Sequence, residues 1–481
     1  MLPDTAPRRE PGAASASPAA TRPHGRAALA AAVVRCASGS RRRLAVGALL
    51  IGGLSFVSAA AGAQGVAPAM GSPTSSLGVR SATDSLEEQA AERVAAAVCG
   101  KRVVLLGELP EHGHARGFGV KARIVERLVA RCGFRAVLFE AGSFDFFGLE
   151  RAIAATQRAP GGPAGAAAVA DRADSLELAL ARAIGGFWWT RELAGWRRWL
   201  LREAVAGRVA VGGLDDQPSA TAAYARATMP GLVGAALPPP RAAECRDAVA
   251  RYFGWGYTAA LPYDGTERAR LADCTRLAAD RALAARTSTA RTGGRRSPDE
   301  VMLGDIASYF ARERTNADGG AGGAPDRDLA MAQHLAWWSA RLPADARIVV
   351  WTATTHATRA PGASPVLPLG VPPLGARLAE RWGDQLAVIG FTALQGEWSR
   401  AGRPIQPLAP LPPHALEARA LAARAAGDAA GWAFLDQAAL RSLGPVPSRL
   451  FGEVTTTDWS AAFDGVLVIR DEAAPTSEPR R

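Results

Sequence analysis

The sequence predicts an α/β fold, with a mainly parallel sheet flanked by helices and a largely helical insertion at about 220–341 over the carboxyl ends of the strands. Short apolar and β-branched runs alternate with helical patterns, which is typical of parallel βαβ units. Several of these runs end on acidic residues or lead into histidines. Because ligands of open parallel sheets bind at the carboxyl ends of the strands, the same pattern predicts a functional site there.

The length of 481 residues and the hydrophobic content of 48% are enough for a large buried core. We expect an N-terminal extension with a signal peptide at 1–63, a linker at 64–82, a single α/β domain at 83–470 and a disordered tail at 471–481. Residues 1–43 hold eight arginines and two acids, which accounts for +6 of the net charge of +11. No aromatic residues interleave with a basic run, so nucleic acid is not expected as a partner.

The N-terminal region has the features of a secretory signal. Arg41-Arg42-Arg43 is basic, residues 44–60 are apolar, and Ala61-Gly62-Ala63 has the small-x-small form of a cleavage site. We therefore expect a secreted or periplasmic protein that meets the membrane only through this leader, if the leader is not cleaved. The alternative is a short membrane anchor, although the apolar run is shorter than the ~20 residues that a span needs.

Four cysteines remain after the leader, an even number that permits disulfides outside the cytoplasm. Cys99 lies eight residues before Gly107 and Cys132 lies eight before Glu140, so the two thiols meet if the following strands are parallel neighbours in register. Cys245 and Cys274 fall in two successive helical patterns that could form a hairpin. We predict the pairs Cys99–Cys132 and Cys245–Cys274, with free thiols as the alternative.

The order of elements follows from these periodicities. The capping-box pattern Asp84-Ser85-Leu86-Glu87 begins a helix to about Val98. A strand at 103–106, a helix and a second strand at 136–139 form the first βαβ unit. The remaining expected elements are helices at 171–184 and 190–205, a strand at 208–214, amphipathic helices at 241–253 and 267–285, a strand at 347–351, a helix at 375–382, a strand at 386–391, a helix near 437 and a last apolar run at 465–469.

Polar residues collect at the ends of the first four strands. In a parallel sheet they converge on one cleft. A single acid or histidine at such a place is more often a helix cap or a hydrogen-bonded loop residue. The combination favours a site, because a histidine held by carboxylates can act as a general base. The residues concerned are Glu108, His112, His114, Glu140, Asp215, Asp216 and His356.

Common hydrolase motifs are absent from the sequence. There is no G-x-S-x-G elbow, H-E-x-x-H helix, P-loop or C-x-x-C pair, so a serine hydrolase of the usual kind, a zincin and a P-loop enzyme are unsupported. Tryptophans recur at helical spacings, which indicates core packing, although one or two could line an apolar pocket. They are Trp188, Trp189, Trp196, Trp199, Trp337 and Trp338.

At these residues the chain resembles the erythromycin esterase family. The blocks that carry the resemblance come in the family's order and cover about residues 84–400. They are Gly107-Glu108 with His112-Gly113 and Lys121; Gly133-Phe134-Arg135 through Glu140; Trp189-Thr190-Arg191-Glu192 through Trp199 to Asp215-Asp216-Gln217; Arg327-Asp328 with Met331-Ala332, then Val349-Val350-Trp351 and His356; and Leu374-Gly375-Ala376 through Ile389-Gly390-Phe391.

The resemblance implies a hydrolase of carboxylic ester or lactone bonds that needs no cofactor. His112 would activate a water for attack on the carbonyl, and Glu108 and Glu140 would orient His112 or tune its pKa. Lys121 and His356 would complete the polar cluster, with supporting or substrate-binding roles for Glu111, His114, Asp215 and Asp216. The expected partner is a small ester or lactone, with macrolides as the family's best-known substrates, and we assume a monomer.

The chain departs from the family pattern at three places. Three residues, Leu109-Pro110-Glu111, separate Glu108 from His112 where the family has two. Arg116 replaces an expected acid, and Ala353 and Thr354 stand where the family has a histidine and an asparagine.

Two other functions therefore stay open. One is a metal-dependent hydrolase with a divalent ion on His112, His114, Glu140, Asp216 and His356, because His-x-His on a strand-end loop is a plausible ligand pair. The other is a binding protein that kept the cleft without catalysis.

Overall fold

The computed structural model describes residues 82–158, 166–219, 222–288, 295–317, 326–360, 370–400, 403–423 and 431–478, all of which belong to one unit, Leu77–Arg481. The predicted leader at 1–63 and nearly all of the predicted linker lie outside the described residues. No helix in the described part is long and apolar enough to cross a membrane.

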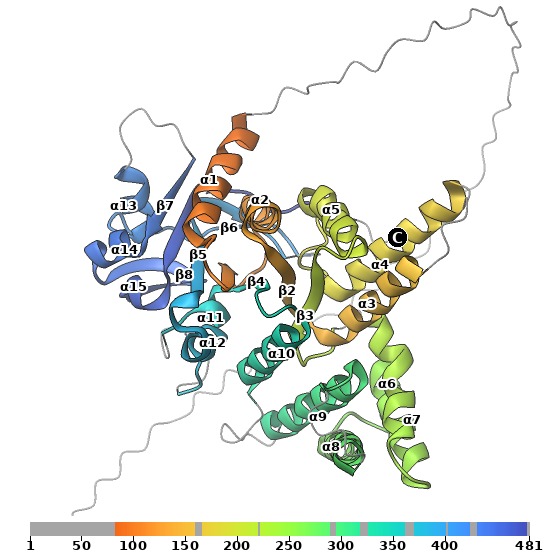
Figure 1. Cartoon of the computed structure of the whole chain (residues 1–481). Helices are drawn as coiled ribbons and strands as arrows, with labels where there is room; N and C mark the ends of the chain where they lie inside the picture. The colour runs from red at the N-terminus through yellow and green to blue at the C-terminus, as the bar shows by residue number, and fades with distance from the viewer. Residues whose placement is uncertain are drawn as a thin grey trace, which may run out of the picture. The chain divides into compact units, whose positions relative to one another are not determined.

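An eight-stranded sheet forms the centre of the fold (Figure 1). Its order is β3-β2-β4-β1-β5-β10-β7, and β6 pairs with β5. Every pairing among β1 to β5 and β10 is parallel, whereas β7 and β6 pair antiparallel with β10 and β5. The strands are β1 (Val103–Glu108), β2 (Phe134–Gly142), β3 (Ala210–Asp215), β4 (Arg347–Ala353), β5 (Leu386–Trp398), β6 (Gln406–Pro407), β7 (Trp432–Asp436) and β10 (Gly465–Glu472). The predicted α/β fold with a mainly parallel sheet is confirmed.

The apolar runs of the sequence become central strands because both of their faces are covered. All six residues of β1 are buried, and β1 pairs with β4 on one side and β5 on the other. Val103 and Leu105 belong to the core on one face, while Val104 and Leu106 belong to the core on the other. This alternation follows from the pleat, in which successive side chains point to opposite faces.

Helices cover both faces of the sheet (Figure 1). One core contains residues of α1 (Ala82–Val98), α2 (Ala115–Cys132), α4 (Ala166–Ile184) and α5 (Ala194–Val205). The other contains residues of α6 (Ala223–Ala235), α7 (Arg241–Gly254), α8 (Gly265–Ser288), α9 (Pro298–Ala317), α10 (Arg327–Arg341), α12 (Leu374–Trp382), α13 (Leu416–Ala422), α14 (Gln437–Leu443) and α15 (Trp459–Ala462). The helix α3 (Ser143–Arg158) contributes to both.

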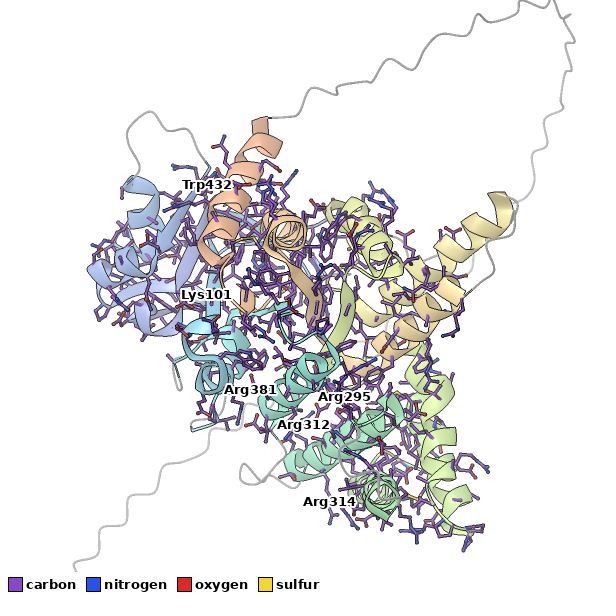
Figure 2. All side chains as sticks on the ribbon, viewed as in Figure 1. Lys101, Arg295, Arg312, Arg314, Arg381 and Trp432 are labelled. Carbon is purple, nitrogen blue, oxygen red and sulfur yellow. A yellow bond between two sulfur atoms is a disulfide. The ribbon has the colours of Figure 1, made fainter. Side chains whose placement is uncertain are left out.

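The helical insertion expected at 220–341 corresponds to α6 through α10. Its helices pack in pairs, α6 against α7 and α8 against α9, while α10 returns to the sheet and packs against β3. The side chain of Arg312 on α9, labelled in Figure 2, reaches Asp216 just after β3. The insertion therefore meets the sheet at the carboxyl end of β3.

The C-terminal part holds more structure than the periodicity indicated. The prediction gave β5 only six residues, but it extends to Trp398. The hairpin of β8 (Val446–Phe451) and β9 (Glu453–Thr457) was not predicted, nor were α3, α13 and β7. Proline-rich flanks and short lengths hide these elements, because a run of five or six residues carries little periodic signal.

The chain after Glu472 differs from the expected disordered tail. Ser477 bridges to Thr190, and the Thr476 amide donates to the Glu192 carboxylate at 2.9 Å. Glu478 forms an ion pair with the fully buried Arg197. A buried guanidinium needs a carboxylate partner, and residues 473–478 supply one. At the other end, α1 begins at Ala82, two residues before the predicted cap.

Both predicted disulfides are present. Cys99–Cys132 has a Cα–Cα distance of 5.2 Å and Cys245–Cys274 one of 5.3 Å. The reason given for the first pair was wrong in one respect, because β4 lies between β1 and β2. Arg347 at the start of β4 donates hydrogen bonds to the carbonyl oxygens of Cys99 and Cys132 and thereby connects the two half-cystines.

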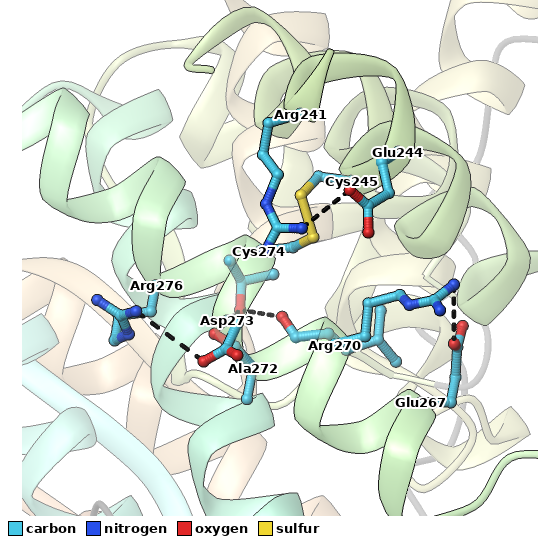
Figure 3. The surroundings of a disulfide bond; sticks show 11 residues. Arg241, Glu244, Cys245, Glu267, Arg270, Ala272, Asp273, Cys274 and Arg276 are labelled. Atoms are coloured by element: carbon cyan, nitrogen blue, oxygen red, sulfur yellow. Dashed lines mark hydrogen bonds and ion pairs between the residues drawn. A yellow bond between two sulfur atoms is a disulfide. The ribbon is translucent and has the colours of Figure 1, made fainter. Parts of the chain in front are cut away.

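The second disulfide ties α7 to α8 within the insertion (Figure 3). Ion pairs flank it, including Arg241 with Glu244 and Arg270 with Glu267. Both sulfur-bearing residues are fully buried, so the crosslink lies inside the helical layer.

The Cys245→Ala/Cys274→Ala double variant tests the contribution of this crosslink. The bridged residues are 29 apart, and loop-closure entropy for such a loop corresponds to about 3–4 kcal/mol. We expect hydrogen exchange of α7 and α8 amides to accelerate while β1 and β4 stay protected. The Cys99→Ala/Cys132→Ala variant is the control, since its crosslink is outside the insertion. Equal acceleration in the sheet and the insertion would contradict this localisation.

Candidate active site

The carboxylate of Glu108, the last residue of β1, is held by four donors. His112 Nδ1 lies 2.6 Å from Oε1, and Trp188 Nε1 donates to the same oxygen at 2.8 Å. Lys121 Nζ donates to Oε2 at 2.8 Å and Trp351 Nε1 donates at 2.7 Å. Glu108 is 2% exposed, so these contacts replace its hydration almost completely.

This arrangement keeps Glu108 ionised. Burial alone would raise its pKa, but the charge of Lys121 and the hydrogen bond and charge of His112 lower the pKa to about 2. Burial lowers the pKa of Lys121 to about 8 against the opposing pull of Glu108. Both groups are therefore charged at pH 7. Lys121 Nζ also lies 4.4 Å from the centre of the Trp351 ring, a cation–π contact.

His112 lies at the edge of this cluster rather than inside it. Its side chain is 11% exposed, and its backbone has a φ of 52° in the left-handed region. In the neutral imidazole the proton lies on Nδ1, which faces an ionised carboxylate, and Nε2 keeps a lone pair. Nε2 has no hydrogen-bond partner among the described residues and is not one of the buried unpaired atoms. An imidazole held in this way is ready to accept a proton at Nε2.

A second cluster surrounds Glu140 on β2. Its Oε2 accepts hydrogen bonds from Thr352 Oγ1 and from the Ala353 amide, both at 2.7 Å. Its Oε1 accepts from Arg327 at 3.2 Å. Burial would raise the pKa of Glu140, but the charges of His356 and Arg327 dominate and hold it well below its usual range.

His356 is placed between an anion and a cation. Its Nδ1 lies 2.9 Å from Asp328 Oδ1, while Nε2 lies 3.0 Å from an Arg327 nitrogen and 3.3 Å from Glu140 Oε1. Burial lowers the pKa of His356, but Glu140 and the Asp328 hydrogen bond raise it by more. The neutral ring accepts from Arg327, whereas the protonated ring donates to Glu140.

Arg327, at the start of α10, links this cluster to β3. It donates to Asp215 Oδ2 from Nε at 3.0 Å and from a terminal nitrogen at 2.6 Å. The nearby charges of Asp215 and Glu140 overcome the effect of burial and raise the pKa of Arg327, which stays charged throughout. Its side chain is 30% exposed.

The neighbouring aspartates behave differently. Burial would raise the pKa of Asp215, but the charge of Arg327 lowers it. Asp216 is fully buried and accepts two hydrogen bonds from Arg312, at 2.8 and 2.6 Å. Burial raises its pKa, and Asp215 adds to the effect. Asp216 therefore anchors α9 to the end of β3 and faces Arg312 rather than His356.

The other two residues of the first loop do not join the His112–Glu108 pair. His114 is 3% exposed, its Nε2 is an unpaired buried atom, and burial lowers its pKa to about 3. It lines a small cavity of about 10 Å³ with Glu108, Thr392 and Glu472. Glu111 is partly buried, and burial raises its pKa. Arg400 donates to the Glu111 carbonyl oxygen at 3.0 Å.

Of the five residues considered as metal ligands, Glu140 and His356 lie 3.3 Å apart, but the five do not form one group. In the described part of the chain, no three His, Cys, Asp or Glu side chains come together as a metal site requires. Glu140 and Asp216 are engaged by arginines, and His114 lines a small cavity together with Glu108.

The two carboxylate clusters flank β4. Glu108 is paired with Ala353 in the β1–β4 register, and the Ala353 amide bonds to Glu140. Strands two positions apart in a sheet lie about 10 Å from each other. The charge of His112 contributes to lowering the pKa of Glu140, so the two clusters interact electrostatically. The expected residues lie at the carboxyl ends of neighbouring strands, but in two clusters on either side of β4: Glu108 with His112, and Glu140 with Asp215 and His356. That the two clusters share one cleft stays a prediction.

Several residues of the site had no role assigned from the sequence. Trp188 was interpreted as core packing, and Trp351, Arg327 and Asp328 were noted only as parts of motifs. Trp188 and Trp351 are indeed buried, but each donates its indole N–H to Glu108. Phe187, which contacts His112, was not singled out at all. Indole donors and stacked rings leave no signal in sequence spacing.

A family model described as erythromycin esterase matches residues 129–472, more than half of the chain. The chain belongs to the erythromycin esterase family. The matched range includes Glu140, Asp215, Arg327 and His356, whereas Glu108, Lys121 and His112 precede it. A search of curated proteins found no match.

Solved structures share the fold of this family member. A mutant of the erythromycin esterase EreC in its open conformation has a TM-score of 0.57 at 17% identity, covering 81% of this chain and 95% of that chain. A Bacillus cereus protein has a TM-score of 0.56 at 16% identity, covering 82% and 99%. A succinoglycan biosynthesis protein has a TM-score of 0.53 at 14% identity, covering 80% and 92%.

The Glu108→Gln variant tests the electrostatic role of this carboxylate. A pKa lowered from 4.5 to about 2 stabilises the fold above pH 4.5 by roughly 3 kcal/mol, and this contribution is lost as pH falls toward 2. We expect the variant to be less stable than the wild type at pH 7, with a difference that narrows below pH 4.5. Urea unfolding between pH 7 and pH 3 measures it. The exposed Glu453→Gln is the control, and a pH-independent difference for Glu108→Gln would contradict the prediction.

Proposed function

We propose that this chain is a hydrolase of carboxylic ester or lactone bonds, with His112 as the general base that activates water. The observation that carries the proposal is the 2.6 Å contact between His112 Nδ1 and the ionised Glu108, which leaves Nε2 as an accessible base. Membership of the erythromycin esterase family supports the reaction class.

In the proposed reaction, a water placed at Nε2 of His112 attacks the carbonyl carbon and gives its proton to Nε2. The imidazolium that forms is stabilised by the Glu108 carboxylate at Nδ1. A positioned base of this kind contributes about 10²–10⁴-fold to the rate. No serine or cysteine nucleophile is needed, which agrees with the absence of a G-x-S-x-G elbow from the sequence.

The cluster around Glu140 supplies the complementary charge. The partly exposed Arg327 would stabilise negative charge that develops on the carbonyl oxygen. The tetrahedral intermediate then collapses, the bond to the leaving oxygen breaks, and that oxygen takes a proton. His356 suits this last step. The protonated ring lies between Glu140 and Asp328, and after it gives up the proton its Nε2 can accept the hydrogen bond from Arg327.

The departures from the family pattern are accommodated locally. The extra residue before His112 is absorbed in a turn closed by the His112 amide and the Leu109 carbonyl oxygen at 3.0 Å, and His112 still reaches Glu108. Where the family has a histidine, the Ala353 amide binds Glu140 directly. These contacts support retained hydrolysis, with an ester or lactone that need not be a macrolide as the proposed substrate.

The His112→Ala variant tests the proposal. We expect kcat/KM for an active ester or lactone to fall by at least 10²-fold, because the general base is lost. His414→Ala removes an exposed histidine elsewhere and serves as the control. Circular dichroism confirms that both variants fold.

Two outcomes would overturn this assignment. The first is wild-type-like turnover by His112→Ala. The second is the absence of any turnover across an ester and lactone panel together with thermal stabilisation of the wild type by one of those compounds, which would indicate the binding protein considered above.

A further inference from the structure

The segment from Gly185 to Trp188 connects α4 to the following turn and lies against His112. Gly185 has a φ of 71°, a left-handed conformation that glycine adopts without strain. The segment places two aromatic rings side by side with opposite exposure. Trp188 is 1% exposed, whereas Phe187 is 40% exposed. A large apolar ring left open beside a base requires an explanation.

Both rings contact the imidazole of His112. Phe187 stacks on it with ring centres 5.0 Å apart and an angle of 27° between the planes. Trp188 meets it edge-on, at 5.6 Å and 85°. Stacking covers a face of the imidazole and leaves the in-plane nitrogen atoms open. Phe187 can therefore fix the plane of the ring without blocking Nε2.

Three independent contacts converge on this imidazole. Trp188 Nε1 and His112 Nδ1 share the same oxygen of Glu108. The left-handed backbone of His112 is unfavourable for a residue other than glycine, so surrounding contacts must hold it. The hydrogen bond to Glu108 holds Nδ1 but does not stop the imidazole from tilting out of its plane. The stacked face of Phe187 restrains that tilt.

Arg400, just after β5, also contacts the Phe187 ring. Its guanidinium carbon lies 6.0 Å from the centre of the Phe187 ring. The same guanidinium donates to the carbonyl oxygens of Glu111 at 3.0 Å and Pro110 at 3.3 Å. Arg400 therefore holds both the loop that leads to His112 and the ring that covers it.

We propose that Phe187 is a positioning and specificity residue for the reaction at His112. Its face fixes the plane of the imidazole, and its exposed edge contacts an apolar group next to the ester bond, so the favoured substrates are esters or lactones with an apolar or aromatic acyl part. This inference rests on the proposed function for its substrate class. The positioning of His112 is a property of the free protein and does not depend on turnover.

The first experiment measures the imidazole itself. In ¹⁵N-histidine-labelled full-length protein, the His112 signals are assigned by their loss in His112→Gln. We expect a single Nδ1–H tautomer in the wild type and in Trp255→Ala, a control that removes another exposed aromatic ring, 65% exposed. Phe187→Ala should show mixed tautomers or broadened His112 signals. Unchanged signals in a folded Phe187→Ala would overturn the positioning role, whatever the enzyme hydrolyses.

The second experiment compares 4-nitrophenyl acetate with the hexanoate and phenylacetate esters. We expect Phe187→Ala to lose about tenfold of the kcat/KM preference for the larger acyl groups, the scale of one aromatic contact. Phe187→Leu keeps an apolar side chain without a stacking face, so it should retain part of that preference and still show a lowered kcat. An unchanged preference in Phe187→Ala would overturn the specificity role.

The two experiments separate the two proposals. If His112→Gln hydrolyses these esters as fast as the wild type, the proposed function fails and the substrate-class part of this inference fails with it. If the wild type is active but the Phe187 variants have the same His112 tautomer and the same acyl-group preference as the wild type, this inference fails. The proposed function then stands.

Discussion

The hydrogen bonds on the Glu108 carboxylate are the interaction on which the rest of the site depends. Four donors come from four separate segments: the loop after β1, α2, the turn before α5, and β4. A buried carboxylate is costly unless it is paired and fully bonded. The ion pair with Lys121 meets that requirement, and the indoles of Trp188 and Trp351 fill the remaining lone pairs. The same carboxylate then orients His112.

The cluster around Glu140 follows a different principle. Its acids share one guanidinium, that of Arg327, so three strand ends and the start of α10 are joined through a single charge. His356 has a hydrogen-bond partner in either charge state, because Nε2 can accept from Arg327 when the ring is neutral and donate to Glu140 when it is protonated. The first cluster fixes a base, and the second can hold or release a proton. In the proposed hydrolysis the first cluster supplies the base and the second supplies the proton, from the two sides of β4.

Much of this arrangement could be predicted because it is periodic or local. The strands β1 to β5 appear as apolar runs, and parallel pairing puts Glu108, Glu140 and Asp215 at one edge. Both disulfides were predicted from the even cysteine count, with the spacing before two strand ends for the first pair and two successive helical patterns for the second, although β4 lies between the two strands. Strands β7 to β9 could not, because they are short and flanked by turns. The role of Arg327 in joining the strand ends could not be predicted, since its partners lie 29 to 187 residues away in the sequence.

The sequence alone determined the α/β class, the positions of the central strands and the polar residues at their ends, because strand periodicity and residue type are properties of the chain itself. Only the tertiary structure decided which of those residues act together. It buried His114 with its Nε2 unpaired, assigned Asp216 to Arg312, and brought Trp188 and Phe187 to the imidazole. The physical reason is that burial and partner geometry set the charge and orientation of each group, and both depend on segments far apart in the chain.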